Sequence, residues 1–126
     1  MTKILVVDDE LLLRDILYES LSSYGYEVIS ASDADKAVEL LEKHQPEVAL
    51  VDIKLPKTSG IELTKMLKER KPDLYIIIIT GYPSFDTAVN ATKFGASEYI
   101  IKPFRLDDLH KTIQKLLNSG SATTTE

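Results

Sequence analysis

Short apolar runs alternate with amphipathic stretches along the chain, and this alternation is its dominant pattern. Unbroken runs rich in β-branched residues are typical of buried strands, whereas apolar residues spaced every three or four positions indicate helices. The runs that predict strands are residues 3–7, 26–31, 48–51, 74–79 and 98–101. A helical pattern follows each of them, and this order predicts an α/β fold in which helices cover both faces of a parallel sheet.

Capping and turn residues mark the ends of the predicted helices. Ser32 or Asp33, Ser59 and Ser84 stand before the second, third and fourth helices, and side chains of this kind cap helix starts. Gly25 is expected to end the first helix, because glycine readily adopts the left-handed conformation there. The apolar positions of that first helix are Leu13, Ile16, Leu17, Leu21 and Tyr24.

Polar residues follow four of the predicted strands at the points where those strands end. Asp8 and Asp9 follow the first strand, Asp52 the third, Thr80 the fourth and Lys102 the fifth. The carboxyl ends of parallel strands share one edge of the sheet, and ligands of open α/β sheets bind at that edge. We therefore expect these five side chains to lie close together.

The combination of side chains at this edge favours phosphoryl transfer. Neighbouring carboxylates repel one another and force one to protonate unless a cation intervenes, and Mg²⁺, with Mn²⁺ as an alternative, prefers such oxygen ligands. Lys102 can neutralise an incoming anion, and the Thr80 hydroxyl can donate a hydrogen bond to it. Together these groups would surround a phosphoryl group passing to a carboxylate nucleophile. We predict an aspartyl phosphate at Asp52.

Composition narrows the classes of partner. The chain has 126 residues, no cysteine and a net charge of −5, which argues against direct nucleic-acid binding because phosphate contacts need clustered Lys and Arg. No segment approaches the length of a membrane span, and the N-terminus lacks the features of a signal peptide. We expect a cytoplasmic protein without a membrane partner. One domain over residues 1–118 is predicted, followed by a polar segment, 119–126, that is a disordered tail or the start of a linker.

The residues at the predicted edge also match a known family. Asp8-Asp9, the D-x-x-L-P-x-x-x-G segment of residues 52–60, Thr80-Gly81 and Lys102-Pro103 together resemble the receiver domain of two-component response regulators, in the superfamily of chemotaxis regulators. Each motif alone is weak, but the set is specific, and it lies on the expected strands in the expected order. The resemblance implies a doubly wound, flavodoxin-like (βα)5 sandwich of three layers with the parallel strand order 2-1-3-4-5.

The resemblance also implies roles for the acidic residues. Asp52 would accept a phosphoryl group from a histidine kinase or a histidine phosphotransfer protein. Asp9 and Asp52 would bind Mg²⁺ directly, the backbone carbonyl of Lys54 would join them, and Asp8 would act through water. The domain would be a phosphoacceptor regulator rather than an enzyme, catalysing only its own phosphoryl transfer and slow dephosphorylation.

Receiver domains change conformation on phosphorylation, and the resemblance implies roles in this change for further residues. Lys102 would pair with the phosphoryl group, and its peptide bond to Pro103 would be cis. Thr80 would move toward the phosphoryl group, and the ring of Tyr99 would turn inward to fill the space. The face made by the fourth helix, fifth strand and fifth helix would then change its partners. An output domain or a protein partner would bind that face. A second copy of the chain is a further expected partner, in a homodimer that forms on phosphorylation.

The resemblance also implies that two positions, which differ among receiver domains, set the lifetime of the phosphate. They lie two residues after Asp52 and Thr80, and here they are Lys54 and Tyr82. A long cation and a bulky ring would shield the phosphoryl group from water, so we expect slower-than-average hydrolysis.

The fourth helix is expected to be the most mobile of the five. It contains residues such as Thr87, Val89 and Asn90, which are only middling helix formers.

Three other functions compete with this one. A phosphatase of the haloacid dehalogenase kind needs a second Asp two residues after its nucleophile, where this chain has Lys54. A flavin-binding domain needs a phosphate loop after the first strand, where this chain has acids that repel phosphate. The third alternative, a receiver-like module that is never phosphorylated, is left open by the sequence.

His44 and His110 show no metal-ligand spacing, and we assign them no role.

Overall fold

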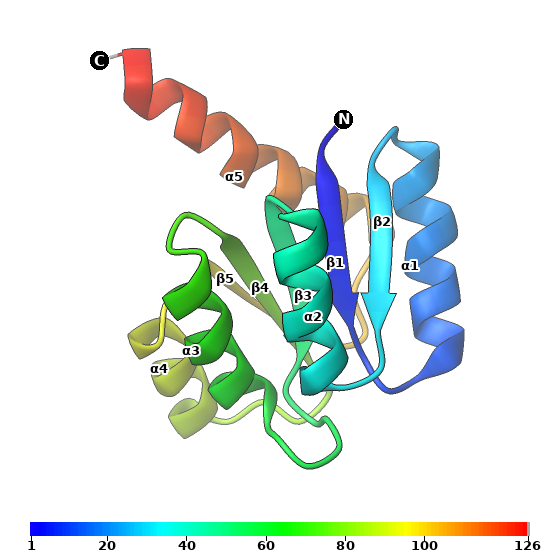
Figure 1. The fold of residues 1–126 in the computed structure, drawn as a ribbon, viewed down its shortest axis with the longest axis vertical. Helices are drawn as coiled ribbons and strands as arrows, with labels where there is room; N and C mark the ends of the chain where they lie inside the picture. Colours follow the sequence, from blue (N-terminus) through cyan, green and yellow to red (C-terminus); the bar gives the residue numbers. More distant parts are fainter. Residues whose placement is uncertain (126) are drawn as a thin grey trace.

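The computed structural model describes the backbone of residues 1–125 and the side chains of residues 1–119. Strands and helices alternate throughout (Figure 1). The strands are β1 (Lys3–Val7), β2 (Glu27–Ala31), β3 (Val48–Asp52), β4 (Tyr75–Thr80) and β5 (Glu98–Ile101). The helices are α1 (Leu11–Ser23), α2 (Ala34–His44), α3 (Gly60–Arg70), α4 (Phe85–Lys93) and α5 (Leu106–Thr125).

The five strands form one parallel sheet in the order β2-β1-β3-β4-β5, which confirms the predicted topology. Every pairing is parallel, so all the strands in Figure 1 point downward and their carboxyl ends lie along one edge. In this register Val7 of β1 pairs with Val51 of β3, and Asp52 of β3 pairs with Ile79 of β4. The ends of β1, β3 and β4 are thus side by side.

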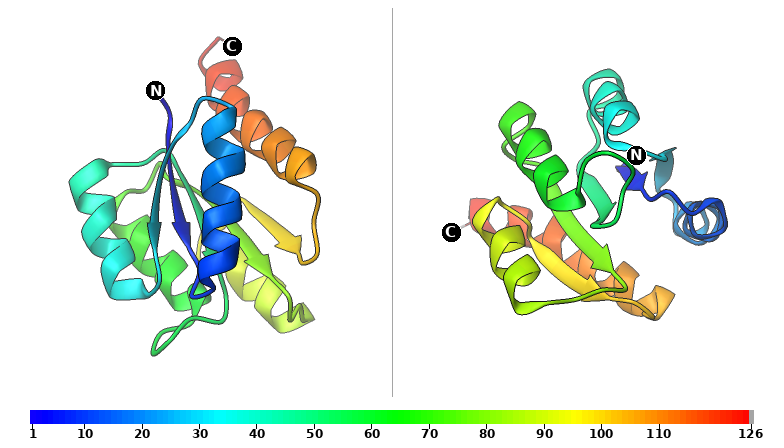
Figure 2. Two further views of the ribbon diagram at one scale, coloured as in Figure 1. Left: turned by 90° about the vertical axis from the view of Figure 1, so that its right-hand side faces the viewer. Right: turned by 90° about the horizontal axis from the view of Figure 1, so that it is seen from below.

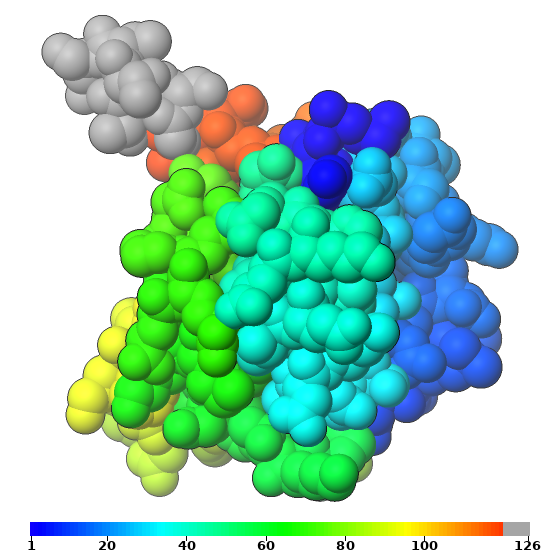
Figure 3. All heavy atoms as spheres, viewed as in Figure 1, coloured from blue at the N-terminus to red at the C-terminus, as the bar shows by residue number. Residues whose placement is uncertain are grey.

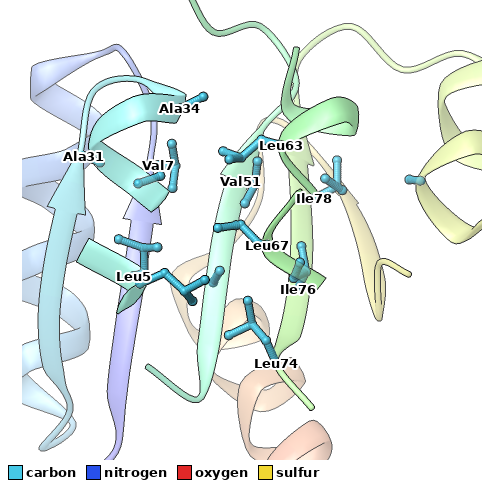
Figure 4. Packing of buried hydrophobic residues seen from close by; sticks show 14 residues of the cluster. Leu5, Val7, Ala31, Ala34, Val51, Leu63, Leu67, Leu74, Ile76 and Ile78 are labelled. Carbon is cyan, nitrogen blue, oxygen red and sulfur yellow. The ribbon is translucent and has the colours of Figure 1, made fainter. Parts of the chain in front are cut away.

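Helices cover both faces of the sheet, because the central strands are apolar on both sides. Helices α2, α3 and α4 lie on one face, and α1 and α5 lie on the other (Figure 2). Alternate strand residues face opposite ways: Leu5 and Val7 pack toward α2 and α3, and Ile4 and Val6 toward α1 and α5. Figure 4 shows the apolar cluster that contains Leu5 and Val7, and Figure 3 shows how α2 and α3 cover that face from solvent.

The predicted caps are present at three helix starts. The side chains of Asp33, Ser59 and Ser84 each accept a hydrogen bond from a backbone N–H three residues later. Of the two candidates before α2, the cap is therefore Asp33. Gly25, with φ +95°, follows the end of α1 as predicted.

Helix α1 differs from the prediction in its start and in its exposed face. It begins at Leu11, two residues before the first predicted apolar position, and Leu11 and Leu12 are exposed. Ile16 was expected on the apolar face, but its side chain is 41% exposed, and of the predicted set only Leu17 and Leu21 are fully buried. Apolar residues lie on two sides of this helix, so spacing alone did not identify the buried side.

Helix α5 is assigned as far as Thr125, beyond the predicted domain boundary at 118. The side chains of residues 120–126, which make up most of the predicted tail, lie outside the described part of the structure. The tail or linker at 119–126 therefore stays a prediction. Within residues 1–125, no helix is both long enough and apolar enough to cross a membrane.

Candidate functional site

Three carboxylates meet at the carboxyl edge of the sheet. Asp8 and Asp9 follow β1, and Asp52 ends the neighbouring strand β3. Each can place one oxygen within 4.8 Å of the oxygens of the other two. Asp8 and Asp52 are only 3% and 8% exposed, whereas Asp9 is open to solvent. Such a group of hard oxygen donors fits a divalent cation such as Mg²⁺.

Lys102 supplies the one ammonium that contacts this cluster among the described residues. Its Nζ lies 3.2 Å from Asp8 Oδ2 and 3.4 Å from Asp52 Oδ2. The residue follows β5 directly, and its backbone N–H donates to the Thr80 carbonyl oxygen at 2.8 Å, which ties it to the end of β4. The Lys102–Pro103 peptide bond is cis, as the resemblance implied.

Backbone N–H groups orient the two buried carboxylates, and a side-chain donor holds the backbone of Asp8. The backbone N–H of Glu10 donates to Asp8 Oδ1 at 2.8 Å, and that of Lys54 donates to Asp52 Oδ1 at 3.3 Å. The guanidinium of Arg14 donates to the backbone carbonyl of Asp8 at 2.7 Å. The sequence had not singled out Arg14; its place one helical turn after the acids was the only available signal.

The loop after β3 approaches the backbone of Asp52 closely. The N–H of Gly60 donates to the carbonyl of Ile53 at 2.8 Å, and a Cβ atom at Gly60 would collide with the backbone carbonyl of Asp52. This position therefore needs glycine for steric reasons, which gives the last residue of the D-x-x-L-P-x-x-x-G segment a physical role.

Burial and charge shift the pKa values of two groups in the site. Loss of solvent raises the pKa of Asp52, the neighbouring Asp8 carboxylate raises it further, and the attraction of Lys102 only partly offsets both. Burial by itself lowers the pKa of Lys102, but the combined attraction of Asp8 and Asp52 is larger, so the net shift is upward. Lys102 is therefore firmly protonated, while Asp52 carries a charge that its surroundings do not fully balance.

An open cavity of about 320 Å³ lies over Asp52. At its rim the Nζ of Lys54 sits 3.8 Å from the centre of the Tyr82 ring, within the range of a cation–π interaction. The sequence singled out these two residues separately, and the structure brings them together as a pair. The cavity is lined by Asp9, Glu10, Asp52, Lys54, Gly81, Tyr82 and Lys102.

The two predicted switch residues lie on neighbouring strands. Thr80 is fully buried at the end of β4, and its Oγ1 accepts a hydrogen bond from the backbone N–H of Tyr82 at 3.0 Å. Tyr99 lies on β5, and its hydroxyl is 2.8 Å from Oγ1 of Thr87 in α4. The sequence indicated nothing of this contact, because it joins a strand to a helix on the far side of a turn.

Neither histidine lies in this cavity. His44 ends α2, and its backbone carbonyl accepts a hydrogen bond from Lys3. The ring of His110 stacks on Tyr24 with 3.6 Å between ring centres, and its Nε2 lies 3.1 Å from the Tyr26 hydroxyl. This arrangement packs α5 against the end of α1 and the start of β2.

Known proteins resemble this chain in both sequence and structure. Residues 4–114 match the family described as "Response regulator receiver domain". The Sporulation initiation phosphotransferase F of Bacillus subtilis (strain 168) is 32% identical over 115 residues, which cover 91% of this chain and 93% of that protein. A crystal structure of a response regulator receiver domain protein (CheY-like) from Methanospirillum hungatei JF-1 superposes with a TM-score of 0.95 at 33% identity and covers 98% of both chains.

Some relatives are much longer than this chain. The Regulatory protein AtoC of Escherichia coli (strain K12) is 35% identical over 119 residues, which cover 94% of this chain but 26% of that protein. The chain thus spans about a quarter of AtoC and nearly all of the Bacillus subtilis protein.

Proposed function

Because the chain belongs to the response regulator receiver domain family, we propose that it is a phosphorylation-dependent switch of a two-component system, with Asp52 as the phosphoacceptor. One observation carries the proposal: Asp52 is a buried carboxylate that shares a single ammonium with Asp8 at the edge of an open cavity. A carboxylate with incomplete charge compensation, facing a space large enough for a phosphoryl group, is placed to act as a nucleophile.

In the proposed reaction an oxygen of Asp52 attacks the phosphorus of a phosphohistidine on a histidine kinase or histidine phosphotransfer protein. The new bond joins that oxygen to phosphorus, the phosphorus–nitrogen bond breaks, and the imidazole leaves with its electron pair. Asp9, Asp52 and the Lys54 carbonyl would hold Mg²⁺, and Asp8 would do so through water. The ion, when bound, would neutralise charge on the phosphoryl oxygens.

Lys102 and Thr80 would stabilise the product. Lys102 already contacts Asp52, so its ammonium needs little movement to pair with a phosphoryl oxygen on that residue. Thr80 would redirect its hydroxyl toward the same group, and Tyr99 would then turn inward. Formation of one stable acyl phosphate, rather than repeated turnover, makes the domain a regulator and not an enzyme.

The proposed partners would use two surfaces next to the site. A groove of about 420 Å³ runs between α1 and the loop after β5, and the exposed Leu12 and partly exposed Ile16 give it an apolar wall beside Lys102. It offers a histidine-bearing partner a docking surface within reach of Asp52. The output partner or domain, or a second copy of the chain, would read the face of α4, β5 and α5, where Phe85 and Ile101 are exposed. The proposed location is the cytoplasm, with neither a membrane nor nucleic acid bound by this domain.

A second candidate is a phosphorelay intermediate that passes its phosphoryl group on to another histidine. The near full-length match to a protein named a phosphotransferase favours this role. Both functions require the same aspartyl phosphate, and transfer of label from the phosphorylated chain to a histidine phosphotransfer protein would distinguish them.

The decisive experiment compares the intact chain with Asp52→Asn. Each is incubated with acetyl phosphate and Mg²⁺, and the mass of the intact protein is measured. We expect one phosphoryl group on the wild type, none on Asp52→Asn, and none on the wild type in EDTA. Equal labelling of both proteins, or no labelling of the wild type by acetyl phosphate, would refute the proposal.

A further inference from the structure

The hydroxyl of Thr87 lies at a junction between the start of α4 and strand β5. Its Oγ1 is 3.2 Å from the backbone nitrogen of Ser84, 3.1 Å from the Ser84 carbonyl oxygen and 3.0 Å from Ser84 Oγ. These contacts are part of a capping box, in which Ser84 Oγ also accepts the N–H of Thr87 at 3.0 Å. The fourth neighbour is the hydroxyl of Tyr99, at 2.8 Å.

Counting protons shows that the Thr87 hydroxyl has room for the Tyr99 contact. A threonine hydroxyl has one hydrogen to donate and two lone pairs to accept with. The N–H of Ser84 occupies one lone pair, and the hydroxyl hydrogen can be directed to an oxygen of Ser84. The second lone pair is then available to the O–H of Tyr99. Either hydroxyl of the Thr87–Tyr99 pair can be the donor, and in both directions a side chain of the same shape without oxygen cannot replace Thr87.

The same junction is connected to the phosphorylation site through a short loop. Thr80 Oγ1 accepts the backbone N–H of Tyr82, and only three residues, 81–83, separate Thr80 from the capping residue Ser84. Helix α4 is weakly anchored elsewhere, because Ala91 is its one buried residue, and Phe85 in its first turn is 83% exposed. The contacts of its N-terminal turn therefore contribute much of what holds α4 against β5.

We propose that Thr87 is a positioning residue that holds the Tyr99 ring at the first turn of α4 in the unphosphorylated protein. The inference rests on the proposed function, in which Tyr99 turns inward when Asp52 is phosphorylated. Turning the Tyr99 ring away from Thr87 breaks this hydrogen bond, so the bond stabilises the ring position seen in this structure. Loss of the bond also removes one partner from the capping hydroxyl of α4, which couples the ring to the helix.

Removal of either hydroxyl should shift the protein toward the switched state. A hydrogen bond of this kind contributes about fivefold to an equilibrium, or roughly 1 kcal/mol. A ligand that binds only the switched state binds more tightly by the same factor as that state becomes more populated. Beryllium fluoride with Mg²⁺, a phosphoryl mimic, is the probe.

The experiment measures the half-saturating beryllium fluoride concentration for the wild type and five variants of the full chain by NMR of labelled tyrosine rings. We expect Thr87→Val and Tyr99→Phe each to lower it about fivefold, and the double variant to lower it no further. Thr87→Ser should behave as wild type because it keeps the hydroxyl. Thr92→Val is the matched control, since Thr92 also has a hydroxyl hydrogen-bonded within α4, to the Ala88 carbonyl at 3.1 Å.

The ring signals add a readout that a purely structural role would not change. Tyr99→Phe identifies the Tyr99 signal by its absence, and that signal should move toward its beryllium fluoride position in Thr87→Val without ligand. If Thr87→Val has an effect but Tyr99→Phe has none, or if their effects add, Thr87 acts only as a helix cap and the proposal is wrong. Urea unfolding of each variant checks that it is folded.

Failure of this proposal can be told apart from failure of the proposed function. A wild-type protein that binds no beryllium fluoride refutes the phosphoacceptor role, and the Thr87 proposal with it. A wild-type protein that binds it, with Thr87→Val and Tyr99→Phe both indistinguishable from Thr92→Val, refutes the Thr87 proposal alone.

Discussion

At the scale of single residues, the site is a set of charges that do not balance in the absence of a further cation. Asp8 and Asp52 are buried, and the ammonium that contacts both of them belongs to Lys102. A buried charge without full compensation costs stability, so the buried carboxylates of this site oppose folding. This conflict gives the site a signature that can be measured without any partner protein.

The change Asp52→Asn should make the metal-free protein more stable at pH 7, by roughly 1–2 kcal/mol, the usual size of a single-residue effect. The pKa of Asp52 is raised above its ordinary value of 3.8, so the fold favours the protonated acid. The cost of the ionised form is present at neutral pH and disappears as the pH falls through the raised pKa. Urea unfolding in EDTA should therefore show the two proteins converging below about pH 4.

Asp73→Asn is the control for this measurement. Asp73 is exposed and pairs with Lys71 at 3.2 Å, which lowers its pKa. Its contribution to stability is present above its ordinary pKa and is lost on acidification, so its substitution should change the pH dependence in the opposite sense. A less stable Asp52→Asn protein at pH 7 would contradict the charge argument.

The Lys54–Tyr82 pair predicts how long the phosphate survives. The ring and the ammonium stand over the cavity above Asp52, where they would hinder an attacking water molecule. Tyr82→Gly should speed the loss of phosphate several-fold, which the decay of labelled protein would measure. Tyr82→Phe keeps the ring and the cation–π contact, so it should decay at the wild-type rate; equal decay of Tyr82→Gly would exclude shielding.

At the scale of elements, the loop between β3 and α3 depends on a close approach of two backbones. Gly60→Ala should lower the free energy of unfolding by about 1–3 kcal/mol, because its new Cβ meets the Asp52 carbonyl and the loop must shift. Gly81→Ala is the matched substitution: a Cβ there makes only ordinary contacts, at 3.9 Å, with Lys102. Urea unfolding that gives equal losses for both variants would show that the loop adapts freely.

Helix α4 should exchange its amide hydrogens faster than the other helices. It buries one residue, Ala91, whereas α1 buries Leu17 and Leu21, and several of its residues are middling helix formers. Hydrogen exchange followed by mass spectrometry or NMR tests this in the unphosphorylated protein. Protection of α4 equal to that of α1 would contradict it.

At the scale of the whole molecule, the sheet separates the acidic cluster from the N-terminus. The acidic cluster lies at the carboxyl ends of the strands, and the N-terminus lies at the opposite end in Figure 1. The two faces are covered independently, α1 and α5 on one and α2, α3 and α4 on the other. An extension at the N-terminus would therefore leave the site accessible.

A chain shortened to residues 1–118 should keep its stability within about 0.5 kcal/mol. The shortened chain keeps the apolar residues by which the end of α5 contacts the core. These are Leu116, which is buried, and Leu117, which packs against the same core. Urea unfolding of the shortened and full chains gives the comparison, and labelling with acetyl phosphate should also be unchanged. A loss of several kcal/mol would place part of the domain beyond Asn118.

Much of this arrangement was already determined by the sequence alone. The alternation of apolar runs and helical patterns predicted five strand–helix units, and the polar strand ends predicted which residues meet. These signals are local, because burial on both faces of a strand and capping of a helix depend on neighbouring residues. The motifs at the strand ends, read with the family resemblance, predicted the strand order as well.

Only the tertiary structure decided which side of α1 is buried and that Arg14 donates a hydrogen bond to the Asp8 backbone. It also decided that the Lys54 ammonium lies over the Tyr82 ring and that the hydroxyls of Thr87 and Tyr99 form a hydrogen bond. Each of these depends on the distance and orientation of side chains from different elements. Periodicity carries no information about such contacts, because they arise when the packed sheet brings separate loops and helices to one edge.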